Sequence, residues 1–265
     1  MTEAFHVTRW GHTGPRVILV HGSAQGSHTG GDQHFSRQQR LADRGWQLLV
    51  PDRPGHGRSA DPGRPDDAEA DGALVADLIG DGAHIVGHSY GGCVALAAAV
   101  KTPAAVRSLT LIEPAMPLLA MHRLAVFRFG IHMALVSLLP MSDISRIKRF
   151  IKLVNIPLEL RGTEDANHAE LARMGRALAR MKLPSRRTLH DQLTRIRAAR
   201  VPVLAVAGTW SPAFRAITDT VAAIAGGKTL VIQADHHFTH LVSDEFNDAL
   251  VGFMQESDAR RGART

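Results

Sequence analysis

The chain contains a single cysteine, Cys93, among its 265 residues, so an intrachain disulfide framework is excluded. Aromatic residues make up only 5% of the sequence, and no apolar run reaches the roughly 20 residues that a membrane-spanning helix needs. Hydrophobic residues make up an ordinary 45% and the formal net charge is only +6, which excludes a chain dominated by disorder. A chain of this length buries a sizeable core without a disulfide or a metal ion to hold it together.

The beginning of the chain, MTEAFHVTRW, has an acidic Glu3 and no apolar core of signal-peptide length. Together with the lone thiol, this absence predicts a cytoplasmic protein. The most apolar stretch, residues 118–139, is interrupted by His122, Arg123, Arg128 and His132, so no membrane span is expected. We interpret this stretch as the lining of a pocket and the core of a helical unit rather than as a membrane contact.

The positive charge is concentrated in one part of the chain. Residues 115–200 contain sixteen Lys and Arg against six Asp and Glu, a formal charge of +10, whereas the rest of the chain carries −4. One interpretation is a solvated basic helix face, and the alternative is a small-molecule substrate with a carboxylate or phosphate that this charge attracts. Nucleic-acid binding is not predicted, because no recognised motif accompanies the basic residues.

Six short apolar runs end in turn residues and lack the polar alternation of half-exposed strands. They are residues 17–20, 47–50, 84–86, 109–112, 203–206 and 229–232. Such runs are typical of strands that are covered on both faces. Helix-forming stretches at 72–79, 93–100, 213–225 and 244–255 separate most of them. The sequence therefore predicts an α/β fold with a mostly parallel sheet and right-handed crossovers.

Residues 115–200 interrupt this alternation and contain only predicted helices. After an apolar first part, these helices cover residues 144–154, 166–181 and 188–200, with Pro140, Pro157 and Pro184 as breaks. Because predicted strands flank the segment, we expect an inserted all-helical cap at 115–200 over a core formed by 1–114 and 201–265.

The strongest chemical signal is Gly87-His88-Ser89-Tyr90-Gly91-Gly92, which follows a predicted strand and precedes a predicted helix. A turn this sharp places Ser89 in a strained backbone region, and a Cβ atom at Gly87 or Gly91 would crowd it. The helix N-terminus behind the serine favours developing negative charge. In this context, the motif predicts a nucleophilic serine rather than an ordinary glycine-rich turn.

This motif resembles the nucleophile turn of the α/β-hydrolase superfamily. Residues 52–59, DRPGHGRS, resemble the turn after that family's fourth strand, and residues 20–23, VHGS, resemble its oxyanion segment. The resemblance implies a capped member with an α/β-hydrolase sheet and a triad in the chain order serine, acid, histidine. It also implies an oxyanion hole made by the backbone N–H groups of Ser23 and Tyr90.

The resemblance places the catalytic base late in the chain, within Asp235-His236-His237-Phe238-Thr239-His240. Alignment on the family's Gly-His turn puts His236 where a glycine usually stands and His237 on the catalytic position. We therefore predict His237 as the base, with His236 as the alternative and His240 at the pocket rim. A metal site formed by these three histidines is not predicted, because their spacing is not typical of zinc sites.

The acid departs from the family's common pattern, because Ser211 stands where many relatives carry an aspartate. A serine cannot carry the charge that orients and stabilises the imidazole. Glu113 ends a predicted strand next to the nucleophile's, so we expect it to substitute at the carboxyl edge of the sheet. The alternative role for Glu113 is a helix-cap or hinge carboxylate. Asp235 and Asp219 are rivals, although Asp235 is close in sequence to His237 and Asp219 is expected to face solvent.

These residues predict a serine hydrolase that cleaves a small-molecule carboxylic ester, thioester or lactone through an acyl-enzyme, without a cofactor or metal. Ser89 also excludes the relatives that use an aspartate nucleophile, namely dehalogenases and epoxide hydrolases. The alternatives are a cofactor-free lyase, an oxygenase or a C–C bond hydrolase on the same scaffold, or a non-catalytic ligand-binding module. Of the other polar residues, Asp52 and Arg53 are expected to tie loops together and His56 to lie in a surface turn.

Overall fold

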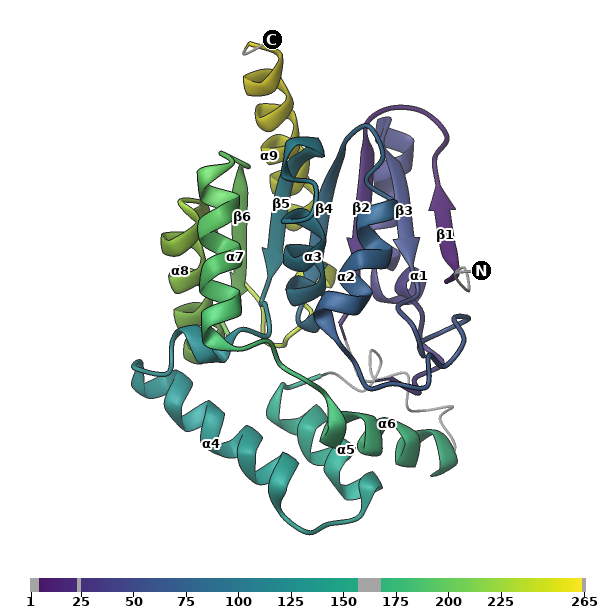
Figure 1. Ribbon diagram of the computed structural model, residues 1–265, viewed down its shortest axis with the longest axis vertical. Coiled ribbons are helices and arrows are strands. Elements are labelled where there is room, and N and C mark those ends of the chain that lie inside the picture. Colours follow the sequence, from purple (N-terminus) through teal and green to yellow (C-terminus); the bar gives the residue numbers. More distant parts are fainter. Residues whose placement is uncertain (1–4, 23–24, 157–167, 264–265) are drawn as a thin grey trace.

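Seven strands pair into one sheet in the order β1-β3-β2-β4-β5-β6-β7 in the computed structural model, which describes residues 5–22, 25–156 and 168–263 (Figure 1). The strands are β1 (Val7–Trp10), β2 (Arg16–Val20), β3 (Gln47–Pro51), β4 (Ala83–His88), β5 (Val106–Ile112), β6 (Val203–Gly208) and β7 (Lys228–Ile232). β1 is antiparallel to β3, and the other neighbours are parallel. The predicted mostly parallel α/β sheet is confirmed.

The six predicted strands all appear, and every residue of the central strand β4 is buried. No sequence pattern predicted β1, whose four residues VTRW are mostly half-buried and contain no apolar run. This edge strand pairs Val7 with Pro51 and Trp10 with Leu48, so pairing with β3 rather than full burial forms it.

Helices cover both faces of the sheet (Figure 1). One face is packed against α2 (Ala68–Asp77), α3 (Tyr90–Ala99), α7 (Arg186–Ala198) and α8 (Pro212–Ala225). The other face is packed against the 3₁₀ helix η1 (Ser36–Arg44) and α9 (Asp244–Gly262), through residues that include Leu41, Phe246 and Leu250. The shorter elements are α1 (Gly31–His34), η2 (Pro103–Ala105), η3 (Pro117–Leu119) and η5 (Thr239–Leu241).

Three further helices lie across the carboxyl ends of the strands, namely α4 (Leu124–Leu138), α5 (Asp143–Leu153) and α6 (His168–Arg180) (Figure 1). They share a small apolar cluster of their own, formed by residues that include Val136, Ile147 and Leu178. The fourth helix of the expected cap behaves differently, because Leu189, Leu193 and Ile196 of α7 belong to the main core. The first residues of the expected helix 166–181 lie outside the described ranges, and the boundaries of the cap at 115 and 200 stay a prediction.

A buried arginine ties together the loops on one side of the sheet. The guanidinium of Arg53 lies 2.7 Å from Asp66 and 2.9 Å from Asp71, and all three side chains are inaccessible to solvent. Its Nε also donates to the carbonyl of His21 at 3.0 Å. His56 contacts the same guanidinium at 3.2 Å and is only 1% exposed. The expected surface turn is therefore wrong for His56, because the ion pairs draw this turn inward.

Replacement of Arg53 tests this buried network. Arg53→Leu leaves the buried carboxylate of Asp66 without its ion pair and leaves Asp71 paired with Arg64 alone, so we expect the free energy of unfolding to fall by about 3–5 kcal/mol. Urea unfolding measures the change. The control is Arg40→Leu, which removes an exposed ion pair with Asp244 and is expected to cost at most about 1 kcal/mol. Equal losses in the two variants would contradict a structural role for the Arg53 pairs.

Candidate active site

Ser89 lies at the sharp turn between β4 and α3, with a left-handed backbone of φ 56° and ψ −122°. The turn depends on glycines, because a Cβ atom at Gly87 would lie 2.4 Å from the carbonyl oxygen of Gly91. A Cβ atom at Gly91 would lie 2.2 Å from the carbonyl oxygen of Val20. Strained non-glycine residues of this kind cluster at functional sites. The local geometry is the one expected from the sequence motif.

Glu113 follows β5 directly and also has a positive φ, 41°. Its side chain is completely buried, and its carboxylate accepts three kinds of hydrogen bond. Oε2 accepts from His237 Nδ1 at 2.6 Å, whereas Oε1 accepts from the Gly208 N–H at 2.7 Å and from Trp210 Nε1 at 2.9 Å. Donors on several sides stabilise an ionised carboxylate in a buried position.

His237 is 3% exposed, and its ring lies beside Phe214, with ring centroids 4.6 Å apart. Because Nδ1 donates to Glu113, Nε2 carries the lone pair. Nε2 is buried and has no hydrogen-bond partner among the described residues. His237 and Ser89 line the same cavity. The histidine with the unpaired Nε2 is therefore the one that shares this cavity with the strained serine. This tautomer is the one that a general base requires.

The rival residues lie elsewhere. His236 accepts a hydrogen bond from the Phe238 N–H, and the side chain of Asp235 is 95% exposed. Asp219 pairs with Arg215 on the exposed side of α8. Ser211, at the position of the family's usual aspartate, caps α8 by accepting from the Phe214 N–H. The structure thus brings together Ser89, His237 and Glu113, and none of the rivals.

The structure describes only one of the two predicted oxyanion donors, Tyr90. The N–H of Tyr90 is the first amide of α3, a position without an acceptor inside the helix. Ser23 lies outside the described residues. His21 holds the backbone just before it, because Nδ1 donates to the Gly22 carbonyl at 2.8 Å and Nε2 accepts from the Arg53 N–H at 2.9 Å.

Trp210 is a site residue that sequence reasoning missed. The segment 208–212 contains no acid, and it contributes the indole N–H and the Gly208 amide that hold Glu113. An indole N–H near a strand end needs a hydrogen-bond partner when it is buried, and this requirement was the available signal. The loop that lacks the usual acid therefore supplies donors to the acid on the neighbouring strand.

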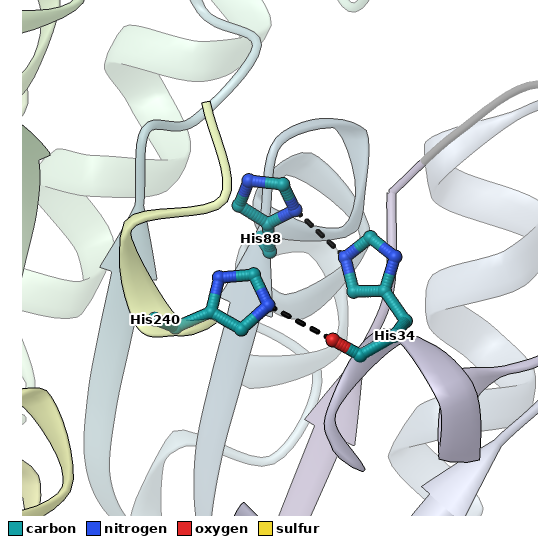
Figure 2. A group of neighbouring side chains, drawn as sticks. All are labelled: His34, His88 and His240. Atoms are coloured by element: carbon teal, nitrogen blue, oxygen red, sulfur yellow. Dashed lines mark hydrogen bonds between the residues drawn. The ribbon is translucent and has the colours of Figure 1, made fainter. Parts of the chain in front are cut away.

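Behind the site, His34, His88 and His240 form a buried cluster that comes from three distant parts of the chain (Figure 2). His88 Nε2 donates to the carbonyl of His237 at 3.0 Å, so its Nδ1 accepts from His34 Nε2 at 2.8 Å. His240 Nε2 donates to the carbonyl of His34 at 3.0 Å. The cluster thus connects the residue before Ser89 with the backbone of His237. His34 gave no signal in the sequence.

These imidazoles are held neutral. Burial lowers the pKa of His240 to about 3, and burial together with the neighbouring imidazoles lowers the pKa of His34 and of His88 well below 6.5. One ring nitrogen from each lies within 4.8 Å of the others, a set of ligand type that suits a divalent metal ion. A metal ion would have to break the hydrogen bond between His34 and His88. The hydrogen bonds of the three histidines fit a hydrogen-bonded network better than a metal site.

The serine and histidine open into a cavity of about 120 Å³. Apart from Ser89, His237 and Ser137, its lining is apolar and comes from both the sheet domain and α4–α6: Ala115, Pro117, Phe129, Met133, Phe150, Val154, Leu178, Met181, Leu183, Phe214 and Ile217. No Lys or Arg is among the described lining residues. Within the part of the chain that the structure describes, no helix is both long enough and apolar enough to cross a membrane.

An open, mostly parallel sheet with a strained serine after its central strand and a His–Glu pair beside it defines a scaffold of the α/β-hydrolase type. A model of the alpha/beta hydrolase family matches residues 17–249. The chain belongs to this family.

Known proteins are similar to parts or to all of the chain. Lipase LipV of Mycobacterium tuberculosis is 38% identical over 119 residues, which are 43% of this chain and 42% of that protein. Esterase Rv0045c of the same organism is 32% identical over 117 residues, 42% and 36% of the two chains. The match thus spans less than half of these relatives. The solved structure of olei00960, a hydrolase from Oleispira antarctica, matches with a TM-score of 0.70 at 17% identity. The match covers 96% of this chain and 95% of that one, and it shows the fold alone.

The neutral histidines predict a pH dependence of stability. Because the folded pKa of His240 lies below the unfolded value of about 6.5, the unfolded state binds more protons below that pH. Its contribution is complete above pH 6.5 and is lost as the pH falls toward 3. His240→Gln removes this contribution, so the free energy of unfolding should fall less steeply as the pH decreases. The difference in slope is up to about 1.4 kcal/mol per pH unit, measured by urea unfolding. The control is the exposed His132→Gln, and an unchanged slope in His240→Gln contradicts the assignment.

Proposed function

We propose that the protein is a serine hydrolase that cleaves a carboxylic ester through an acyl-enzyme, with Ser89 as nucleophile, His237 as base and Glu113 as acid. The carrying observation is the 2.6 Å contact of His237 Nδ1 with the buried Glu113 carboxylate, which leaves Nε2 unpaired among the described residues in a histidine that lines the cavity of Ser89. Thioesters and lactones undergo the same chemistry.

In the first half-reaction, Ser89 Oγ attacks the carbonyl carbon of the ester, and its proton passes to His237 Nε2. Glu113 stabilises the resulting imidazolium through Nδ1. The negative charge on the carbonyl oxygen is stabilised by the N–H of Tyr90, and the resemblance adds the N–H of Ser23 as second donor. Collapse of the tetrahedral intermediate breaks the bond to the alcohol, which takes the proton from Nε2.

In the second half-reaction, a water molecule attacks the acyl-enzyme while His237 Nε2 accepts its proton. The tetrahedral intermediate collapses, the bond to Ser89 Oγ breaks, and the proton on Nε2 returns to the serine. The carboxylic acid then leaves. The cycle needs no group beyond the chain and water.

The cavity indicates a short acyl group. A volume of about 120 Å³ is close to the roughly 150 Å³ that accommodates a benzene-sized molecule. Its apolar lining fits an aliphatic or aromatic acyl chain better than a charged one. The alternative of an anionic substrate therefore finds no support in this cavity, whose described lining contains no Lys or Arg side chain. The names of the relatives, a lipase and an esterase, support an ester as substrate.

Labelling with a fluorophosphonate tests the proposal. We expect a single adduct on the wild type by intact-mass measurement, no adduct on Ser89→Ala, and labelling slowed by at least about 100-fold in His237→Ala and Glu113→Gln, because the serine then lacks its base or a correctly oriented one. The matched control is Asp235→Asn, which removes an exposed acid next to the same histidine and should leave the rate unchanged.

An unlabelled, folded wild type contradicts the acyl-enzyme. If a small-molecule substrate is nevertheless converted, the chemistry is that of a lyase, an oxygenase or a C–C bond hydrolase on this scaffold. If none is converted, the chain is a ligand-binding module. Normal labelling of Glu113→Gln together with loss in Asp235→Asn would move the acid to Asp235.

The size of the cavity makes a second prediction. Met133→Ala removes a side chain from the lining, so longer acyl chains should be accepted. We expect the ratio of kcat/KM for nitrophenyl octanoate over nitrophenyl butanoate to rise about 10-fold. His132→Ala, at the neighbouring exposed position, is the control. An unchanged ratio in Met133→Ala would place the acyl chain outside this cavity.

A further inference from the structure

Helix α4 exposes a row of large apolar side chains. Leu124, Phe127, Ile131, Leu135 and Leu138 are 71%, 48%, 43%, 45% and 81% exposed. Their spacing of three or four residues places them on one face of the helix, which we call the α4 stripe. From Leu124 to Leu138 the stripe is about 21 Å long at 1.5 Å per residue. A continuous exposed apolar surface of this kind marks an interaction site.

The opposite face of the same helix is already occupied. Phe129, Met133 and Ser137 line the catalytic cavity, and Val126 and Val136 are buried. The expectation that this apolar segment forms pocket lining and helical core thus accounts for one face of α4 only. The stripe lies on the other side of a single helix from the cavity, and nothing in the chain's own core requires it to be apolar.

The charge on α4 and on the residues next to it in the sequence is of one sign. Residues 115–142 contain no Asp or Glu, while Arg123 and Arg128 are exposed, and Arg128 lies four residues from Leu124 on the stripe's side of the helix. Helix α5, which packs against α4, exposes Lys148, Arg149 and Lys152. An exposed apolar face bordered by cations is typical of helices that lie in a membrane–water interface.

A second copy of the chain fits this surface less well than a lipid. A symmetric dimer would place the stripe against its own equivalent, with Arg128 near its counterpart and no acidic residue of 115–142 to offset the repulsion. An anionic lipid surface offers both an apolar interior for the leucine side chains and negative headgroups for the arginines. We propose that the α4 stripe docks the protein on membranes that contain anionic lipids, with the catalytic cavity directly behind the docked helix.

Co-sedimentation with vesicles tests this proposal without any use of catalysis, so its outcome is independent of the ester-hydrolase proposal. The full chain is mixed with vesicles of phosphatidylcholine alone or with phosphatidylglycerol. We expect binding to the anionic vesicles, weakened by salt and much weaker on the zwitterionic ones. Ile131→Glu/Leu135→Glu should lower the partition coefficient at least about 10-fold, because it replaces two inserted aliphatic side chains by charges.

The matched control is Gln255→Glu/Ala259→Glu, which introduces two negative charges at the same spacing on exposed positions of α9. It should bind as the wild type does. A second variant, Arg128→Gln, retains the apolar stripe and should weaken binding to anionic vesicles about 5-fold. Urea unfolding checks that the variants are folded, and none of these residues lines the cavity.

The proposal is overturned if the wild type does not bind anionic vesicles, or if Ile131→Glu/Leu135→Glu binds as well as its control. Light scattering after size-exclusion chromatography tests the alternative that a second copy of the chain binds the stripe. A wild-type dimer that the stripe variant converts to a monomer, without vesicle binding, would assign the stripe to a second copy of the chain.

Discussion

The site depends on one buried hydrogen bond, that between the Glu113 carboxylate and His237 Nδ1. It joins residues 124 positions apart in sequence, and it forms because parallel strands end at the same edge of the sheet. β4 presents Ser89, β5 presents Glu113, the turn after β6 presents the donors to Glu113, and the segment after β7 presents His237. The register of four successive strands thus sets the distances among the groups that act together.

Two of the four described non-glycine residues with positive φ lie at that edge. Ser89 and Glu113 both have positive φ, a conformation that costs on the order of 1–3 kcal/mol for a non-glycine residue. The sheet supports both, since the Ser89 N–H donates to the Ile112 carbonyl at 2.9 Å and the Glu113 N–H donates to the Val206 carbonyl at 2.8 Å. The two strained residues are therefore anchored to neighbouring strands, which keeps the turn rigid.

A layer of neutral imidazoles supports the same edge from within. His88 joins the turn at Ser89 to the carbonyl of His237, and His34 continues the connection to α1 (Figure 2). Burial keeps these rings uncharged, so they form directional hydrogen bonds without adding a cation near His237. The orientation of His237 is thereby held through its side chain by Glu113 and through its backbone by this network.

Local patterns in the sequence determined much of this protein. Apolar runs marked six strands, and the strand–turn–helix context marked Ser89, because both depend on neighbours in the chain. The contact of His237 with Glu113 rather than Asp235, the donors from Trp210 and the partnership of His34 with His88 depend on the tertiary structure, since each joins residues that are distant in sequence. The same holds for α4, which has apolar residues on both of its faces. Only packing decides that its Met133 side covers a cavity while its Ile131 side meets solvent.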